Sequence, residues 1–193
     1  MSRSHNPLTT LALAVVALTA CSRQPASPPA AAVAPSNEAT AELAKIKAVE
    51  AEQQKNLANF DDLDFNVYSH QKWDELKKSH AANIVVHYPD GHTTTGLAPH
   101  IEELKPMFVF APDTRVTVHP LKLAQGNLTA VTGVLEGTFT KPMPIGGGKT
   151  IAPTNKAFKL DMATVGVWEN GVMKEEYLYW DNQALLKQIG VAK

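Results

Sequence analysis

The residues best suited to acid–base chemistry lie in the last predicted strand, Val172–Trp180, and directly after it. Alternate side chains of a strand share a face, so without a bulge one face carries two carboxylates, two phenols and a methionine. These residues are Met173, Glu175, Tyr177, Tyr179 and Asp181. A carboxylate in an apolar pocket has a raised pKa and can act as a base near neutral pH. Asp181 is therefore a candidate acid/base, although an aspartate here would equally cap the terminal helix that follows it.

Histidines form a second set of candidates, because five of them fall within forty residues. They are His80, His87, His92, His100 and His119. One or two in a pocket would hydrogen-bond a substrate carbonyl or orient the carboxylate, and we rank His87 first, then His119, then His100. The alternative is that all of them are structural or surface residues. No spacing matches a zinc signature, and the Gly146–Thr150 segment lacks the spacing of a phosphate-binding loop, so we predict no metal and no cofactor.

Further residues are expected to line the pocket. Tyr88, Phe108 and Trp168 suit a hydrophobic ligand, as do Tyr177 and Tyr179, although aromatic residues are at least as often plain core. Glu136 faces either the pocket or the outer surface of the sheet, because strand parity alone does not say which.

The elements that must position these groups are helices first and strands later. Helical spacing of apolar residues predicts helices over 38–59, 72–79 and 96–110, with Asp61 and Asp62 as a break or cap after the first. Strand patterns cover 83–88, 115–123, 128–140, 157–168 and 172–180, and Asn170-Gly171 predicts a tight hairpin between the last two. This order indicates an α+β fold with helices packed on a curved antiparallel sheet.

The first twenty residues are typical of an export signal. Arg3 is followed by an apolar run, Leu8–Ala20, that is too short to span a bilayer, and Leu18-Thr19-Ala20-Cys21 resembles the lipobox of bacterial lipoproteins. We therefore predict a signal peptide over 1–20 and lipidation of Cys21, the only cysteine. The Pro- and Ala-rich segment 21–37 is expected to be an extended tether. The net charge of −1 argues against nucleic acid as a partner.

A series of short motifs between Phe60 and Gly190 resembles the SnoaL-like proteins, also called predicted ester cyclases, of the NTF2-like superfamily. The motifs include His87-Tyr88-Pro89-Asp90-Gly91, Phe110-Ala111-Pro112-Asp113, Gly137-Thr138-Phe139-Thr140 and Trp180-Asp181-Asn182-Gln183. The resemblance implies a cone-shaped α+β barrel over 60–190 that encloses an apolar pocket. It also implies that Asp181 is the acid/base and that a homodimer forms. The preceding strand, 158–168, lacks the histidine that cyclases of this type carry, which weakens the transfer of polyketide cyclisation itself.

The leading functional hypothesis is an envelope lipoprotein whose pocket removes a proton next to a carbonyl, as cyclases, isomerases or hydratases do. In it Asp181 is the acid/base, and His87 or His119 is its hydrogen-bond partner. The alternative is a non-catalytic module of the same fold that binds a small hydrophobic ligand or another protein.

Overall fold

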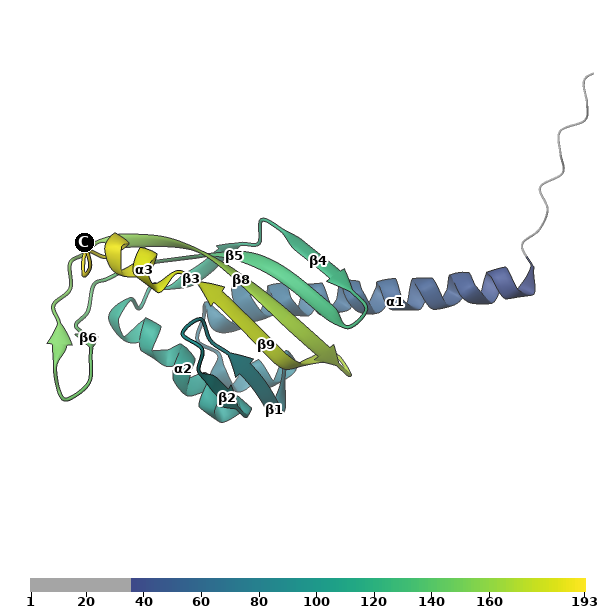
Figure 1. Ribbon diagram of the computed structural model, residues 1–193, viewed down its shortest axis with the longest axis horizontal. Coiled ribbons are helices and arrows are strands. Elements are labelled where there is room, and N and C mark those ends of the chain that lie inside the picture. The colour runs from purple at the N-terminus through teal and green to yellow at the C-terminus, as the bar shows by residue number, and fades with distance from the viewer. Residues whose placement is uncertain (1–35) are drawn as a thin grey trace, which may run out of the picture. The chain divides into compact units, whose positions relative to one another are not determined.

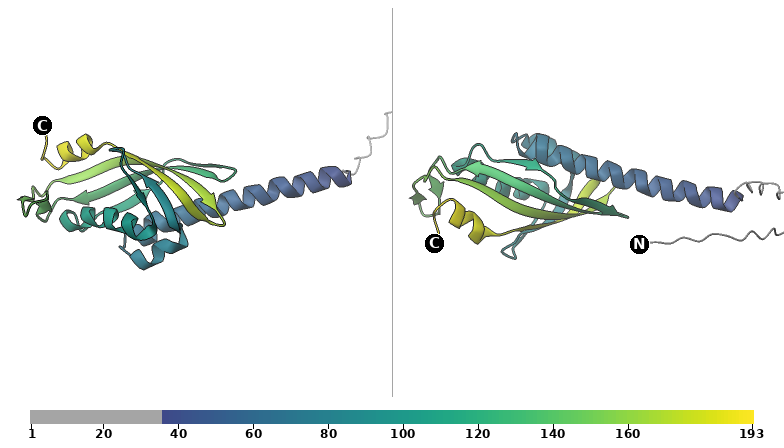
Figure 2. Two further views of the ribbon diagram at one scale, coloured as in Figure 1. Left: turned by 60° about the horizontal axis from the view of Figure 1, so that its bottom comes forward. Right: turned by 90° about the horizontal axis from the view of Figure 1, so that it is seen from above.

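A strongly curved, mostly antiparallel sheet packs against helices on one of its faces in the computed structural model, which describes residues 36–193 (Figure 1 and Figure 2). The predicted α+β class is confirmed. The signal peptide, Cys21 and the tether lie outside the described residues except for Ser36 and Asn37. Of the helices in residues 36–193, none is long and apolar enough to cross a membrane.

Three helical segments come first, a fourth lies between the second and third strands, and the remaining strands follow in succession before the last helical segment of the described chain. The helices are α1 (Asn37–Asp62), the π-helix η1 (Leu63–Tyr68), the 3₁₀-helix η2 (Trp73–Lys78), α2 (Leu97–Phe110) and α3 (Asn182–Gln188). The strands are β1 (His80–His87), β2 (Thr93–Thr95), β3 (Arg115–Val118), β4 (Lys122–Gln125), β5 (Leu128–Thr138), β6 (Met143–Pro144), β7 (Thr150–Ile151), β8 (Ala157–Glu169) and β9 (Val172–Trp180). The main sheet has the order β2-β1-β9-β8-β5-β3, and β4 also pairs with β5.

Helix α1 does not stop at the two aspartates, where the sequence predicts a break. It runs through Asp62 and continues directly into η1, so that Asp61 and Asp64 both belong to one helical stretch. Only the end of α1 packs on the sheet, through buried Leu57 and Phe60. π-helical turns inside helices often mark functional sites, because they shift the direction of the side chains that follow.

The predicted strand 115–123 is in fact two strands. β3 ends at Val118 and β4 begins at Lys122, and Pro120, which has no N–H to donate to a ladder, lies between them. The predicted hairpin at Asn170-Gly171 is confirmed, since both residues have positive φ, 52° and 79°.

A bulge in β9 decides which of its side chains face inward. Trp168 pairs with Met173 and Val167 pairs with Glu175, so Lys174 is an extra residue in the strand. Met173 is therefore fully buried, yet the next inward residue is Glu176, three positions later. The face expected to carry Glu175, Tyr177 and Tyr179 into a pocket is the opposite face of the sheet.

Candidate active site

A cavity of about 200 Å³ lies between the inner face of the sheet and the helices. Its walls are mainly apolar and come from η1, α2, β3, β5, β8 and β9, with Leu63, Leu104, Leu135, Leu160 and Leu178 among the lining residues. The cavity is smaller than the roughly 300–1,000 Å³ of most ligand pockets, so it suits a small ligand. Two buried groups of polar side chains lie on these walls, around Asp64 and around Glu176, and an exposed group of Asp90, His92 and Glu103 lies at the mouth.

The first group is a chain of charges that runs from the cavity to the surface. Asp64 lines the cavity and accepts a hydrogen bond of 2.8 Å at Oδ2 from Nε2 of His119. The other ring nitrogen of His119 donates to Oδ1 of Asp61, also at 2.8 Å, and Asp61 in turn pairs with Lys122. The side chain of His119 is only 2% exposed, and Phe65 stacks on its ring at 4.4 Å.

The charges in this chain set each other's proton affinity. Burial raises the pKa of Asp64, and the hydrogen bond from His119 offsets only part of that effect. Burial opposes the charged form of His119, but its hydrogen bonds to Asp64 and Asp61 outweigh this and raise its pKa. A buried carboxylate with a raised pKa can act as a general base, and the imidazolium beside it stabilises its ionised form.

Tyr68 lies one helical turn after Asp64 and also lines the cavity. Burial raises the pKa of this phenol, and the negative charge of Asp64 raises it further. The hydroxyl therefore keeps its proton. A protonated phenol beside a base can donate a hydrogen bond to a carbonyl oxygen.

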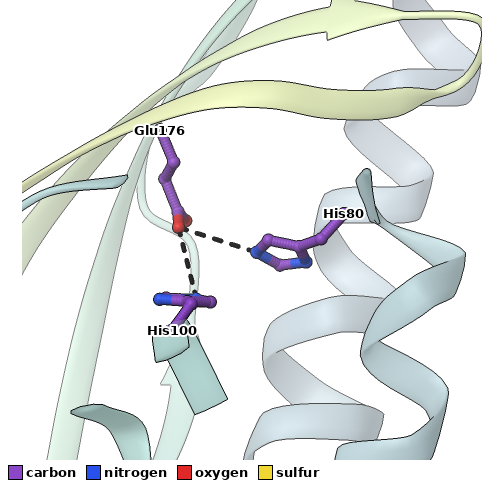
Figure 3. Close-up of side chains that lie close together, drawn as sticks. All are labelled: His80, His100 and Glu176. Carbon is purple, nitrogen blue, oxygen red and sulfur yellow. Dashed lines mark ion pairs between the residues drawn. The ribbon is translucent and has the colours of Figure 1, made fainter. Parts of the chain in front are cut away.

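The second group joins three elements around one carboxylate (Figure 3). Glu176 of β9 points toward His80 at the start of β1 and His100 of α2. Its Oε2 lies 3.6 Å from Nε2 of His80 and 3.5 Å from Nε2 of His100, and all three side chains are at most 5% exposed. Burial raises the pKa of Glu176, but the two imidazoles outweigh this and lower it, so Glu176 is ionised.

Of the residues predicted from sequence, His119, Tyr88 and His100 are found at these two groups. Tyr88 lines the cavity, and its hydroxyl lies 2.8 Å from Nδ1 of His100. His119 does not line the cavity but reaches it through Asp64.

Three further predicted residues lie on the opposite face of the sheet. His87 contacts Oε1 of Glu175 at 2.8 Å and stacks on Tyr177 at 4.3 Å, and none of these lines the cavity. Tyr179 is 54% exposed. In β9 the physical reason is the bulge at Lys174, which places Glu176 and Leu178 inside and Tyr177 and Tyr179 outside. In β1 the inward residues are Ile84 and Val86, which are fully buried, so the next residue, His87, faces the other side of the sheet. We correct the expected pocket position of His87, Tyr177 and Tyr179 accordingly.

Asp181 takes the position that the capping alternative describes. It is exposed, and its Oδ1 accepts from the backbone N–H groups of Gln183 and Ala184 at 2.8 and 3.0 Å, at the start of α3. It is not among the residues that line the cavity, although both of its sequence neighbours are. Its catalytic role remains a sequence-based hypothesis without support from this geometry.

The remaining predicted pocket residues belong to the core or the surface. Phe108 packs edge-to-face on Tyr68 and Trp73, and the indole N–H of Trp168 donates to Thr129 at 2.8 Å. Neither borders the cavity. Glu136 lies on the outer side of β5, where it pairs with Lys159 and Arg115.

Sequence reasoning missed Asp64, Tyr68 and Glu176 as site residues, and it named His80 among the candidate histidines without ranking it. A signal for Asp64 was present, because an ionisable side chain interrupts the apolar run Leu63–Val67. No comparable signal exists for Glu176, since only the bulge brings it to the inner face.

Comparisons with known proteins agree with this fold. A protein from Jannaschia sp. CCS1, provisionally assigned as a SnoaL-like polyketide cyclase, matches with a TM-score of 0.63 at 16% identity, over 73% of this chain and 95% of its own. IdmH from Streptomyces antibioticus, provisionally a polyketide cyclase, matches with a TM-score of 0.61 at 21% identity, over 70% of this chain and 99% of its own. A SnoaL-like polyketide cyclase from Agrobacterium tumefaciens matches with a TM-score of 0.53 at 18% identity, over 72% and 98%. No curated protein matches the sequence at a significant level.

The fold is that of the NTF2-like proteins, with a curved sheet that closes over a small cavity. The sequence model of the SnoaL-like polyketide cyclase family matches residues 62–189, and the chain belongs to this family.

The position of Asp181 makes a prediction that separates capping from catalysis. Replacing Asp181 with Ala should lower the free energy of unfolding by about 1 kcal/mol, because the two N–H groups at the start of α3 lose their acceptor. Asp181→Asn should change it little, since asparagine caps equally well. Chemical denaturation of both variants measures this, and equal losses in the two would contradict the capping role.

Proposed function

We propose that the chain is an acid–base enzyme that removes a proton next to the carbonyl group of a small hydrophobic compound. The observation that carries this proposal is Asp64, a buried carboxylate at the wall of an apolar cavity, with a histidine hydrogen-bonded behind it. Membership of the SnoaL-like polyketide cyclase family supports this class of reaction. Asp64 thus takes the role that the sequence-based hypothesis gave to Asp181.

In the proposed reaction, Asp64 in its ionised form takes the proton from the carbon next to the carbonyl. The negative charge that develops on the carbonyl oxygen is stabilised by a hydrogen bond from the Tyr68 hydroxyl. His119 orients the carboxylate, and the pairing of His119 with Asp61 keeps the imidazole charged. In an isomerisation, Asp64 returns the proton to another carbon of the substrate. In a cyclisation, the ring closes first and the proton then goes to an oxygen. Neither reaction needs an outside oxidant or reductant, because only protons and bonding pairs within the substrate move.

The first test measures proton abstraction directly and does not require the natural substrate. The full chain is incubated in D₂O with a panel of small apolar ketones and β-keto esters, and proton NMR follows loss of the signal next to the carbonyl. Asp64→Asn should slow the catalysed exchange by about 10²–10⁴-fold, the usual contribution of a general base.

The matched control is Asp62→Asn, because Asp62 lies on the same helix but does not line the cavity. This variant should exchange at the wild-type rate. Equal rates for Asp64→Asn and the wild type, or no exchange with any compound by the wild type, would contradict the proposal and favour a non-catalytic binding module.

The Asp64–His119 pair also predicts the pH dependence of that exchange. The working state needs Asp64 ionised and His119 protonated, so the rate should rise with pH as Asp64 loses its proton and fall as His119 does. Because both pKa values are raised, the rising limb should lie above 3.8 and the falling limb above 6.5. The two limbs belong to the coupled pair. A rate that stays constant once Asp64 is ionised would contradict the role of His119.

We also propose that Cys21 is lipidated and anchors the domain in a bacterial envelope, where it forms a homodimer. The support for the anchor is the Leu18–Cys21 motif and the Pro-rich segment after it. The support for a dimer is family resemblance alone.

Lipidation has its own test, which is metabolic labelling with a clickable palmitate in a bacterial host. The wild-type chain should carry the label, Cys21→Ser should not, and Ser22→Ala should keep it, because that change leaves the thiol in place. An unlabelled wild-type chain would contradict the lipoprotein proposal.

A further inference from the structure

His80, His100 and Glu176 form a cluster that the proposed proton transfer does not use. One ligand-type atom from each, Nε2 of both histidines and Oε2 of the glutamate, lies within 4.8 Å of the other two (Figure 3). The three residues come from β1, α2 and β9, which are far apart in sequence and meet at one wall of the cavity. All three are buried.

The atoms that face one another in this cluster do not satisfy one another. Nε2 of His80 and Oε2 of Glu176 are buried and have no hydrogen-bond partner within residues 36–193. Their separation of 3.6 Å is too long for a hydrogen bond. A buried polar atom without a partner destabilises the folded protein, so such atoms call for an explanation, such as an ion.

A hydrogen bond at Nδ1 of His80 leaves Nε2 of the same ring available for a ligand. The Ser79 hydroxyl donates to the Leu76 carbonyl at 3.1 Å, so its oxygen accepts from Nδ1 of His80 at 2.8 Å. The proton of the neutral ring is then on Nδ1, and the lone pair of Nε2 points toward Glu176. Metal-binding histidines almost always show this second hydrogen bond.

His100 has the same kind of support. Its Nδ1 lies 2.8 Å from the Tyr88 hydroxyl, which has Thr94 as a further partner at 3.4 Å. When Nδ1 donates to Tyr88 and Tyr88 donates to Thr94, Nε2 of His100 presents a lone pair, which is the tautomer that a metal ligand requires. Burial lowers the pKa of His100 to about 4, so the ring is neutral near pH 7.

A carboxylate buried in an apolar wall needs positive charge beside it, and either protons on the two imidazoles or a metal cation between the three atoms supplies that charge. The separations of 3.5 and 3.6 Å are close to the edge of a tetrahedral metal site, about 3.4 Å for metal–ligand bonds of about 2.0–2.1 Å. We propose that His80, His100 and Glu176 bind a divalent transition-metal ion of the Zn²⁺ or Fe²⁺ class, with an open coordination position toward the cavity.

The ligand types determine which ions fit. Two imidazoles and one carboxylate suit zinc or non-haem iron, whereas magnesium and calcium favour sites made of oxygen atoms. Three protein ligands leave at least one position for water or a substrate oxygen, as in catalytic zinc sites. The metal site itself is independent of the proposed function. Only the role of the ion in polarising the substrate carbonyl rests on that proposal.

The test is Zn²⁺ titration of the full chain by calorimetry, compared with Glu176→Gln and His80→Asn. The wild type should bind one Zn²⁺ per chain at this site, and each variant should bind it at least about 100-fold more weakly, because loss of even an outer partner of a metal site costs about 10–100-fold. The matched control is His92→Asn. His92 lies at the exposed mouth of the cavity beside Asp90 and Glu103, and its loss should leave the affinity unchanged.

A second measurement on the wild type covers the case in which a buried substitution prevents folding. Titration with paramagnetic Co²⁺, followed by NMR, should shift or broaden the ring signals of His80 and His100. The signals of His70, an exposed residue in the turn after η1, should stay unchanged. Binding that survives Glu176→Gln, or Co²⁺ effects confined to other histidines, would overturn the metal site and favour a shared proton within the cluster. Because deuterium exchange tests Asp64 separately, either proposal can fail while the other stands.

Discussion

The structure depends on the burial of two carboxylates, Asp64 and Glu176, in the wall of one apolar cavity. An ionised carboxylate away from water is strongly destabilising unless an opposite charge and hydrogen bonds surround it. Asp64 has His119, which is itself balanced by Asp61 and Lys122. Glu176 has only the two imidazoles of His80 and His100, at distances that leave its Oε2 without a hydrogen bond. The two carboxylates are thus suited to different tasks, one to exchange a proton and the other to hold a cation.

Two irregular elements make this arrangement possible. The π-helical turn η1 continues α1 past the point where it would otherwise end, and it directs Asp61 and Asp64 onto the two nitrogens of one imidazole. The bulge at Lys174 moves the side chains after it to the other face of the sheet and so brings Glu176 to the inner face. Both features interrupt regular hydrogen bonding, and irregularities of this kind are common next to functional sites.

The sequence predicts the fold far better than the site. The 3.6-residue spacing in α1 and α2, the β-branched strands and the Asn170-Gly171 turn are local signals, and each is found in the structure. Which strand residues reach the site depends on the alternation of side chains between the two faces of the sheet. A single inserted residue reverses that alternation. Regular alternation predicts Tyr177 and Tyr179 in the pocket, whereas the structure has Glu176 and Leu178 there. His119 was ranked among the catalytic candidates, but its partners 55 and 58 residues away cannot be read from a sequence pattern. No motif in the sequence marks the cluster of His80, His100 and Glu176, because its residues come from three separate elements.

The most direct test of the two-carboxylate account is a pH titration of the full chain by NMR, with the side-chain carboxyl carbons of Asp64 and Glu176 assigned. The account predicts that Asp64 titrates above the ordinary aspartate value of 3.8 and Glu176 below the ordinary glutamate value of 4.5. The ring of His119 should then titrate above 6.5 and that of His100 near 4. An Asp64 that titrates at or below 3.8 would mean a solvated carboxylate, and the cavity would lose its base.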